Sequence, residues 1–455
     1  MFAGFDYGTS NCAIGVIYED STVKLLPIDE GQPFMPSALY AIERELICDL
    51  VGQSIGDESL RQSYIAQRGN QLGQARRVRL EEGISADEQS LFVGREAFEQ
   101  YLALPEDGYF VKSPKSFLGA SGLRPESMAF FEDLVTAMMM QVKQRAETSL
   151  GQSIEHTVIG RPVNFQGVDA EQSNRQALDI LKVAAQRSGF RSVEFLYEPL
   201  AAGLDFEVRL NSEKTVLVVD VGGGTTDCSM VRMGPKQRQQ LDRQHDFLGH
   251  SGERVGGNDL DIQLAGKALM PLFGMLSPLK SGLPTPRQAF WDAVSTNNVG
   301  AQSEFNSQRT RLHLQQLLVD TSEPNKIERF MLLREAKQNH QLVRSAELCK
   351  IALSDAEQAA VDLGYVEQDL YHDVTRTDFA EAIERPVAKI VELMSEAISQ
   401  AGCQPDLIYV TGGTAKSPVI RSAIEQRLGH IDVVDGDHFG SVAAGLTVWA
   451  EKLFR

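Results

Sequence analysis

The stretch VLVVDVGGGTTD at residues 216–227 decides the fold that this sequence predicts. Its apolar first half indicates a buried strand, and the glycines indicate a tight turn into a second strand that starts near Cys228. Consecutive glycines cost conformational entropy, so we expect them where the backbone must approach a ligand closely. Asp220, Thr225 and Asp227 add oxygen atoms around the turn, which indicates a site for phosphate or for a hard cation.

A similar turn lies near the start of the sequence, where residues 2–6 and 12–18 predict two strands around YGTSN at 7–11. Asp6 ends the first of these strands, and its carboxylate can hold a hydrated Mg²⁺ ion. Taken alone, this turn is explained by an ordinary hairpin with a capping aspartate. Together, the two turns could clamp a triphosphate from two sides, although neither matches a Walker loop or a dinucleotide fingerprint.

The rest of the chain predicts strands that alternate with helices, which is typical of an α/β fold. LIYV at 407–410 predicts a third strand, followed by TGGT at 411–414 and a helix that opens at Pro418. The recurrence of an apolar strand followed by a Gly/Thr turn resembles an internal duplication. Apolar residues at helical spacing predict helices over 128–149, 169–188 and 377–401, the last ending at Gly402.

Two long segments are less regular, and we expect both to be peripheral subdomains. Residues 41–110 are polar and contain several glycines, whereas residues 262–340 are rich in Gln, Asn and Pro before a helical pattern begins. The proline-rich stretch at 277–286 predicts a loop. Either segment could be an interaction surface, but elaborated loops are the simpler interpretation.

Composition excludes several classes of protein. The chain has 455 residues, 44 Lys and Arg against 62 Asp and Glu, and a formal net charge of −18, which argues against nucleic-acid binding. The cluster Arg76, Arg77 and Arg79 is interpreted as a solvated face. We find no secretory signal and no apolar run that predicts a membrane span. The five dispersed cysteines indicate reduced thiols in the cytoplasm and argue against a zinc site.

Six motifs resemble the nucleotide-binding half of the heat shock protein 70 family, the DnaK-like chaperones of the actin/hexokinase ATPase superfamily. The two turns are similar to the family's first and second phosphate loops, and the order of motifs covers essentially the whole chain. The motifs are GFDYGTSN at 4–11, KSFLG at 115–119, YEPLAAG at 197–203, DVGGGTTD at 220–227, VGGNDLD at 255–261 and VTGGTAKSP at 410–418.

The resemblance implies a two-lobed actin-like ATPase fold, in which each lobe has a core mixed sheet with helices and a peripheral subdomain. We expect lobe I to comprise residues 1–212 and 435–455, with its peripheral subdomain at about 38–130. Lobe II would comprise residues 213–434, with its peripheral subdomain at about 256–383. The nucleotide would lie at the base of the cleft between the lobes. We expect no C-terminal peptide-binding domain after Arg455, so client binding by the family's usual mode is not expected.

The resemblance also implies the roles of the site residues. Asp6 and Asp220 would hold Mg²⁺ through water, and Lys115 would contact the γ-phosphate and the attacking water. Glu198 and Asp227 would orient that water. The expected catalytic set is Lys115, Glu198, Asp220, Thr225 and Asp227. The expected nucleotide-binding residues are Gly8, Thr9, Ser10, Asn11, Gly222, Gly223, Gly224, Thr225, Gly256, Gly257, Glu347, Lys350, Ile351, Ser354, Gly412, Gly413, Thr414 and Lys416.

Two of these roles have simpler alternatives when the residues are taken singly. Without the two turns, Lys115 would be interpreted as a surface lysine. Glu198 would be interpreted as a carboxylate that starts a helix before Pro199. The complete set suits phosphoryl transfer, in which positioning and charge neutralisation do most of the catalysis.

The predicted base-binding face departs from the family. Glu347, Lys350, Ile351 and Ser354 follow helical spacing and share one helix face, which the resemblance places against adenine and ribose. Ile351 and Lys416 stand where the family has two arginines that sandwich the adenine. Neither side chain has a planar guanidinium, so we expect looser base selectivity.

The function expected from these residues is a Mg-dependent, slowly hydrolysing, chaperone-like ATPase that binds ATP and ADP. It would be a monomer that couples its nucleotide state to an unidentified protein partner or co-chaperone. Two alternatives remain open: a small-molecule, sugar-type kinase of the same superfamily, and a non-catalytic, nucleotide-gated interaction protein. The segment EPLAA at 198–202, just before the second turn, favours the chaperone-like ATPase.

Overall fold

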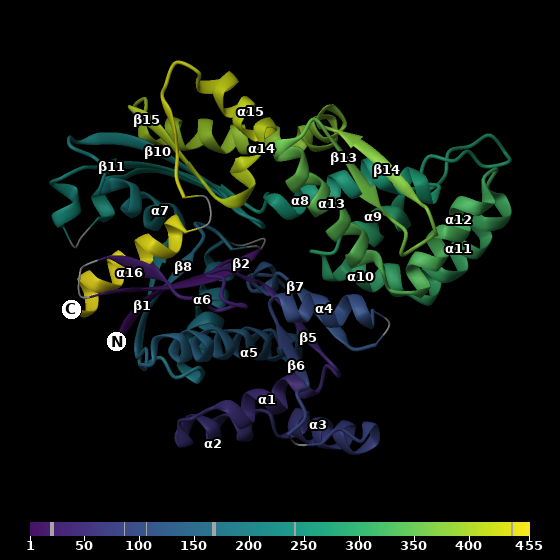
Figure 1. Cartoon of the computed structure of the whole chain (residues 1–455), viewed down its shortest axis with the longest axis horizontal. Coiled ribbons are helices and arrows are strands. Elements are labelled where there is room, and N and C mark those ends of the chain that lie inside the picture. The colour runs from purple at the N-terminus through teal and green to yellow at the C-terminus, as the bar shows by residue number, and fades with distance from the viewer. Residues whose placement is uncertain (19–21, 86, 106, 166–169, 241–242, 438–439) are drawn as a thin grey trace.

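The chain folds into two α/β lobes, drawn in the lower and upper halves of Figure 1. The computed structural model describes residues 1–18, 22–85, 87–105, 107–165, 170–240, 243–437 and 440–455. Each lobe combines a core mixed sheet with packed helices and a smaller peripheral part, so the predicted two-lobed architecture is confirmed. The boundaries between the lobes near residues 212 and 435 stay a prediction.

Both lobes are built on mixed sheets of the same strand order and direction. The first sheet runs β3 (Val23–Leu25), β2 (Asn11–Ile17), β1 (Phe2–Tyr7), β8 (His156–Arg161) and β9 (Ser192–Tyr197), with β4 (Met35–Pro36) beside β2. The second sheet runs β12 (Phe247–Glu253), β11 (Thr226–Met233), β10 (Lys214–Val221), β15 (Leu407–Thr411) and β16 (Val433–Asp435). In each sheet the central strand has an antiparallel hairpin partner on one side and a parallel strand on the other.

This shared topology refines the predicted duplication. The predicted strands around both glycine turns and at 407–410 are confirmed, and the hairpins β1–β2 and β10–β11 occupy equivalent places in their sheets. By contrast, β15 occupies the place of β8, because each pairs parallel with the central strand. Two of the three Gly/Thr turns therefore belong to equivalent hairpins, and the third follows β15, which has no hairpin partner of this kind among the residues that the structure describes.

The segment 41–110 is more regular than its sequence indicated. It contributes to a small sheet with strand order β6, β5, β7 and to four helices. These elements are β5 (Ala38–Ala41), α1 (Leu46–Ser54), α2 (Glu58–Gln67), α3 (Gly69–Glu82), β6 (Leu91–Val93), α4 (Arg95–Ala103) and β7 (Tyr109–Lys112). Gly52 and Gly73 lie inside helices rather than in loops. The periodic signal is weak because α3 buries only Leu72 and Ala75.

Longer helices cover the first sheet. The predicted helix at 128–149 is confirmed, and the one at 169–188 is confirmed over 170–187, since residue 169 lies outside the described residues. The remaining elements of this lobe are η1 (Pro114–Phe117), α5 (Pro125–Leu150), α6 (Ala170–Arg187), α7 (Glu198–Glu207) and α16 (Ser441–Phe454). Arg68, between α2 and α3, fastens these peripheral helices to α5. Its guanidinium donates hydrogen bonds to Asp133 at 3.0 Å and to Glu132 at 2.8 Å.

The second lobe carries most of the remaining helices, which lie to the upper right in Figure 1. Its helix at 377–401 is confirmed as α14, which ends at Gly402 with a positive φ of 65°. The predicted loop at 277–286 contains no helix. The elements are η2 (Gln237–Gln239), η3 (Gln244–Asp246), α8 (Gly257–Leu264), η4 (Ala265–Leu269), η5 (Met270–Phe273), α9 (Gln288–Val294), α10 (Val299–Asn306), α11 (Gln308–Asp320), α12 (Pro324–Glu335), α13 (Asn339–Asp355), β13 (Gln358–Asp362), β14 (Tyr371–Thr375), α14 (Arg376–Ala401), η6 (Gly413–Lys416) and α15 (Pro418–Leu428).

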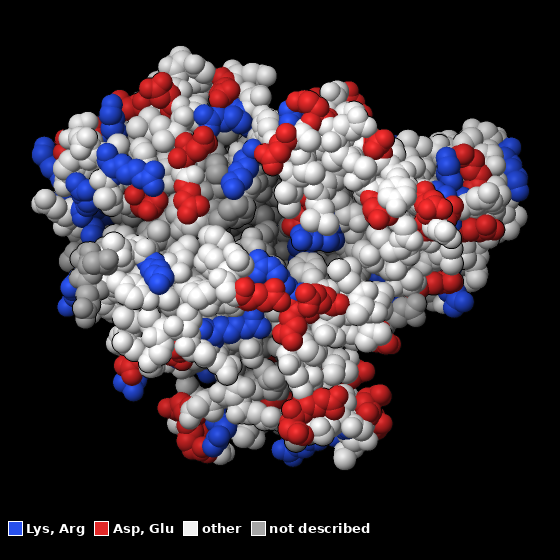
Figure 2. Space-filling model, viewed as in Figure 1, with Lys and Arg blue, Asp and Glu red and all other residues white. Residues whose placement is uncertain are grey.

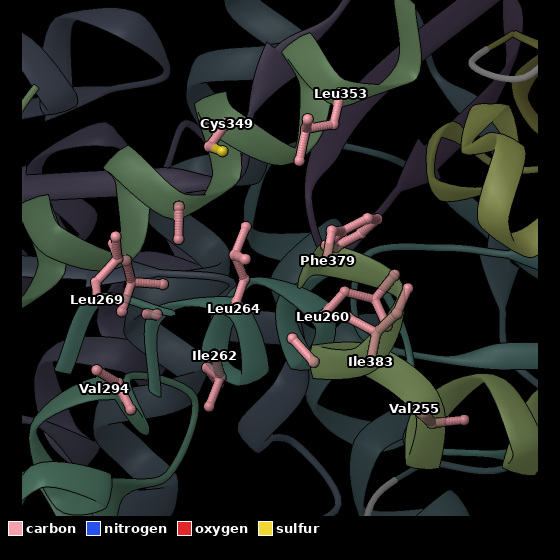
Figure 3. Packing of buried hydrophobic residues seen from close by; sticks show 14 of the residues in the cluster. Val255, Leu260, Ile262, Leu264, Leu269, Val294, Cys349, Leu353, Phe379 and Ile383 are labelled. Atoms are coloured by element: carbon pink, nitrogen blue, oxygen red, sulfur yellow. The ribbon is translucent and has the colours of Figure 1, made fainter. Parts of the chain in front are cut away.

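The core of the second lobe holds α8 in place. Leu260 and Leu264 of α8 belong to one buried apolar cluster with Leu353 of α13 and with Phe379 and Ile383 of α14, as Figure 3 shows. Because α8 begins directly after Gly256, this packing fixes the position of the VGGND segment. That segment faces the second glycine turn.

Another apolar cluster joins the two sheets through α7 and α16. The two helices cross closely at Gly445, where an added Cβ would lie 1.7 Å from the carbonyl oxygen of Ala201. α16 also packs tightly on β1, since a Cβ at Gly4 would lie 2.1 Å from the backbone nitrogen of Thr447. The lobes therefore share a continuous apolar base under the cleft.

Surface features and cysteines agree with the composition. Figure 2 shows acidic and basic side chains interspersed over the visible face. The five cysteines are free thiols, and four of them are buried. Among the described residues, we find no helix whose length and apolar character would let it cross a membrane.

Candidate functional site

The two glycine turns come from different sheets and meet tip to tip. A Cβ added at Gly223 would lie 1.7 Å from Ser10 Oγ, and one added at Gly224 would lie 2.5 Å from Thr9 Cγ2. The sequence interpretation attributed these glycines to close approach by a ligand. The structure adds a second requirement, because side chains at these two positions would collide with residues of the opposite turn.

Carbonyl groups of the second turn bind the segments that surround it. The Gly222 oxygen accepts hydrogen bonds from the Gly257 N–H at 2.9 Å and from Thr414 Oγ1 at 3.0 Å. The Gly223 oxygen accepts one from the Asn258 N–H at 2.7 Å. The start of α8 and the third turn are therefore fastened to the second turn, although they lie far from it in sequence.

A single cavity of about 560 Å³ opens where these turns meet, and both lobes line it. Its volume lies within the range of small-molecule sites, about 300–1,000 Å³. The structure brings together most residues that the sequence predicted for the site. The predicted residues that line the cavity are Asp6, Gly8, Thr9, Ser10, Asn11, Glu198, Asp220, Gly222, Gly223, Thr225, Gly257, Glu347, Lys350, Ile351, Gly412, Gly413 and Thr414.

The other predicted residues neighbour this lining. Lys115 contacts Glu198, and Gly224 and Gly256 lie against the turns. The Ser354 hydroxyl donates to the Lys350 carbonyl at 3.4 Å on the same helix. Lys416 lies in η6, two residues beyond Thr414. Their roles toward a nucleotide stay predictions.

Four carboxylates gather at the base of the cavity around one lysine. Asp220 and Asp227 are directly paired across β10 and β11, and both are buried. Burial, reinforced by the charge of Glu198, raises the pKa of Asp6 to about 7 and that of Asp227 to about 7. The same causes raise the pKa of Asp220 well above its usual range. The raised pKa values reflect acidic groups crowded together away from water, and a bound cation would stabilise their ionised forms.

Lys115 is buried at the centre of this cluster, with 5% of its surface exposed, so its interpretation as a surface lysine is wrong. Its Nζ lies 2.5 Å from Glu198 Oε1. Burial alone would lower its pKa, but the charges of Glu198 and Asp6 outweigh that effect and raise the pKa. The lysine is thus held in its charged form. Glu198 begins α7, so its interpretation as a helix-start carboxylate and its place in the cavity are both correct.

The oxygen atoms of the carboxylates are of the kind that suits a hydrated Mg²⁺ ion. Within the described part of the chain, no three His, Cys, Asp or Glu side chains are close enough to ligate one ion together. Asp6 and Asp220 both line the cavity from the two opposed hairpins. Mg²⁺ prefers oxygen ligands and usually keeps several of its waters, which suits two such carboxylates.

Comparison with known proteins agrees with this geometry. The model of the family described as "Hsp70 protein" matches residues 123–267 and 316–453, which is more than half of the chain. The chain belongs to the Hsp70 family. The predicted resemblance is therefore confirmed, and the fold is the two-lobed actin-like ATPase fold.

Individual relatives of this Hsp70-family chain are distant. It is 24% identical over 462 residues to the chaperone protein HscA homolog of Burkholderia cenocepacia. It is 23% identical over 437 residues to the chaperone protein dnaK of Emiliania huxleyi. The alignments cover 100% and 94% of this chain but only 58% and 56% of the two relatives. The chain thus spans little more than half the length of the chaperones it matches.

Sequence reasoning missed one wall of the cavity in this Hsp70-family chain. Arg95, Phe98, Glu99 and Leu102 of α4 line it and are spaced at i, i+3, i+4 and i+7, the signature of one helix face. That spacing was available in the sequence, but no motif marked it as functional. The further lining residues are Pro36, Lys112, Asn258, Asp261, Arg344, Ser441 and Val442.

Ion pairs occupy the predicted base-binding face. Glu347 Oε2 lies 2.7 Å from Lys112 Nζ, which belongs to the other lobe, and 2.9 Å from Arg344 Nη1. Burial would raise the pKa of Glu347, but Lys112 and Arg344 hold it below its ordinary value. Lys350 Nζ lies 2.7 Å from Asp261 Oδ1, and burial raises the pKa of Asp261 to about 6 despite that pairing. The Glu347 pairing therefore links the two lobes across the cavity.

Proposed function

We propose that this Hsp70-family chain binds ATP and ADP with Mg²⁺, hydrolyses ATP slowly, and communicates its nucleotide state to a protein partner such as a co-chaperone. One observation carries the proposal. Two hairpin turns from two sheets meet at a single cavity, beside a cluster of four carboxylates and one lysine that are all buried except the half-buried Asp6. This arrangement offers backbone N–H groups to phosphate and oxygen atoms to a hydrated cation.

The residues of the cluster would divide the chemistry between them. Asp6 and Asp220 would hold hydrated Mg²⁺, which supplies positive charge opposite the phosphate oxygens. Lys115 would donate a hydrogen bond to the γ-phosphate, and Glu198 and Asp227 would accept hydrogen bonds from the attacking water and orient it. Phosphoryl transfer requires mainly positioning and charge neutralisation, and the buried charges of this site provide both.

The organisation around the site is part of the proposal. Lobe I would comprise residues 1–212 and 435–455, lobe II residues 213–434, and a protein partner would respond to the relative position of the lobes. The free thiols support a reducing compartment such as the cytoplasm. The relatives named as chaperones support a chaperone-type partner for this chain.

Single-turnover hydrolysis of Mg-ATP tests the proposal. We expect Lys115→Ala to slow hydrolysis by about 10²-fold, a loss typical of one charge-stabilising group. ATP affinity should change much less. Lys143→Ala is the matched control, because Lys143 is also buried and pairs with Glu147 on the distant helix α5.

Three outcomes would contradict the proposal. Equal hydrolysis in the two variants would remove Lys115 from the chemistry. Failure of the parent chain to bind ATP would refute nucleotide binding altogether. Transfer of phosphate to a sugar or polyol instead of water, assayed with a panel of acceptors, would replace the ATPase with the sugar-type kinase.

A further inference from the structure

The cavity has a second end, away from the carboxylates, where one helix from each lobe contributes a wall. α4 lines it with Phe98 and Leu102, and α13 lines it with Arg344, Glu347 and Ile351. The two helices belong to the peripheral parts of opposite lobes (Figure 1). Apolar side chains lie here among charged ones such as Arg95 and Glu99.

Direct contacts hold α4 against α13. The Tyr101 hydroxyl, on α4, donates to the Lys337 carbonyl at 2.9 Å and accepts from the Gln341 N–H at 3.3 Å. The Phe98 ring packs on Phe110 at 5.2 Å between centroids. The Arg344 guanidinium lies 5.3 Å from the centroid of the Phe98 ring. Phe98 is therefore positioned by both lobes.

Apolar surface remains exposed inside this end of the cavity. Leu102 is 44% exposed and Ile351 is 52% exposed, although both line the same hollow as the half-buried Phe98. Large apolar side chains exposed in a cavity lose contact with water when a flat apolar group binds there. The charged neighbours Arg344 and Glu347 provide a donor and an acceptor at the rim.

We propose that Phe98, Leu102 and Ile351 form an apolar cradle for the base of the bound nucleotide. This inference rests on the proposed function, namely that a nucleoside triphosphate occupies the cavity with its phosphates at the turns. Because Phe98 and Leu102 come from one lobe and Ile351 from the other, the base contacts both lobes at once.

The test compares two probes in the presence of Mg²⁺: ATP, which has a base, and inorganic tripolyphosphate, which has none. Affinities are measured by titration calorimetry. We expect Phe98→Ala to weaken ATP binding about 10-fold, since stacking on an aromatic ring contributes an effect of this size. Tripolyphosphate affinity should be unchanged. Phe98→Tyr keeps the ring and should restore ATP binding to within about twofold.

Two neighbouring leucines provide a control for effects of misfolding on the measured affinity. Leu102 lines the cavity, whereas Leu104, two positions later and 51% exposed, lies outside its lining. Leu102→Ser should weaken ATP binding about 3-fold, and Leu104→Ser should leave it unchanged. Because both side chains are already largely exposed, neither change removes buried core packing.

The outcomes separate this inference from the proposed function. If the parent chain binds neither probe, the proposed function fails and the cradle fails with it. If it binds both probes but Phe98→Ala and Leu102→Ser leave ATP affinity unchanged, the cradle alone is refuted. An equal loss of ATP and tripolyphosphate affinity also refutes it, because the effect would then act on the phosphate end.

Discussion

Replacing Gly223 by alanine tests how closely the two hairpin turns pack. The new Cβ would lie 1.7 Å from Ser10 Oγ and 2.7 Å from Ser10 Cβ, whereas ordinary contact begins at 3.4 Å. Rotation of the hydroxyl relieves the first overlap but not the second, so the turns must separate. Overpacking of this kind costs about 1–3 kcal/mol, and we expect Gly223→Ala to reduce the free energy of unfolding by that amount.

Urea denaturation of a double-mutant cycle measures this cost. Ser10→Gly removes both overlapping atoms, so the double variant should recover most of the stability, with an interaction energy of about 1 kcal/mol or more. Gly222→Ala is the control, because its Cβ would meet only the Thr225 oxygen at 3.3 Å. The reasoning is refuted if Gly223→Ala is as stable as Gly222→Ala, or if Ser10→Gly gives no recovery.

Three further predictions concern charges. Asp220→Asn removes one ionisable group from the crowded carboxylate cluster. The ligand-free chain should therefore unfold at a higher urea concentration, and Mg-ATP should bind more weakly. Unchanged urea stability and unchanged Mg-ATP affinity would contradict the role given to the cluster. Burial, together with the charge of Lys112, lowers the pKa of His340 from 6.5 to about 4. The folded state therefore resists protonation of this imidazole. The free energy of unfolding should keep its full value above pH 6.5 and be lower by about 2 kcal/mol at pH 5. His340→Gln should reduce this loss, as measured by urea denaturation at each pH. Arg68→Met leaves buried Asp133 without its closest ion pair and should cost about 3–5 kcal/mol by thermal or urea unfolding, against a negligible effect for an exposed arginine such as Arg175.

The sheets and turns were predictable because their signals are local. An apolar run followed by glycine and threonine predicts a strand and a turn whatever the rest of the chain does, and both hairpins appear where expected. Helices with wide apolar faces, such as α14, were equally clear. The helices α1 to α3 were not, because none of them has a clear apolar face. α2 and α3 bury too few side chains to produce a period, whereas α1 is short and buried over most of its length.

The candidate site was only partly predictable, because its missing parts depend on tertiary contacts. Nothing within KSFLG shows that Lys115 is buried against Glu198, since that contact joins residues 83 positions apart. The packing of Gly223 against Ser10 could not be predicted for the same reason, as Ser10 belongs to the other lobe. The α4 wall needed the relative position of both lobes, which no local pattern contains.

The packing of α16 on β1 has a consequence for the order of folding. A helix from the end of the sequence packs on a strand from its start. During synthesis, the apolar face of the first sheet that α16 covers therefore stays exposed until Ser441–Phe454 emerges. The second sheet and its helices come from one nearly continuous stretch, and local contacts form faster than distant ones. The later half of the chain can thus assemble before the earlier half is complete. A ribosome-bound intermediate should accordingly expose β1 and β8 to chaperones that bind unfolded segments, although these strands are translated early.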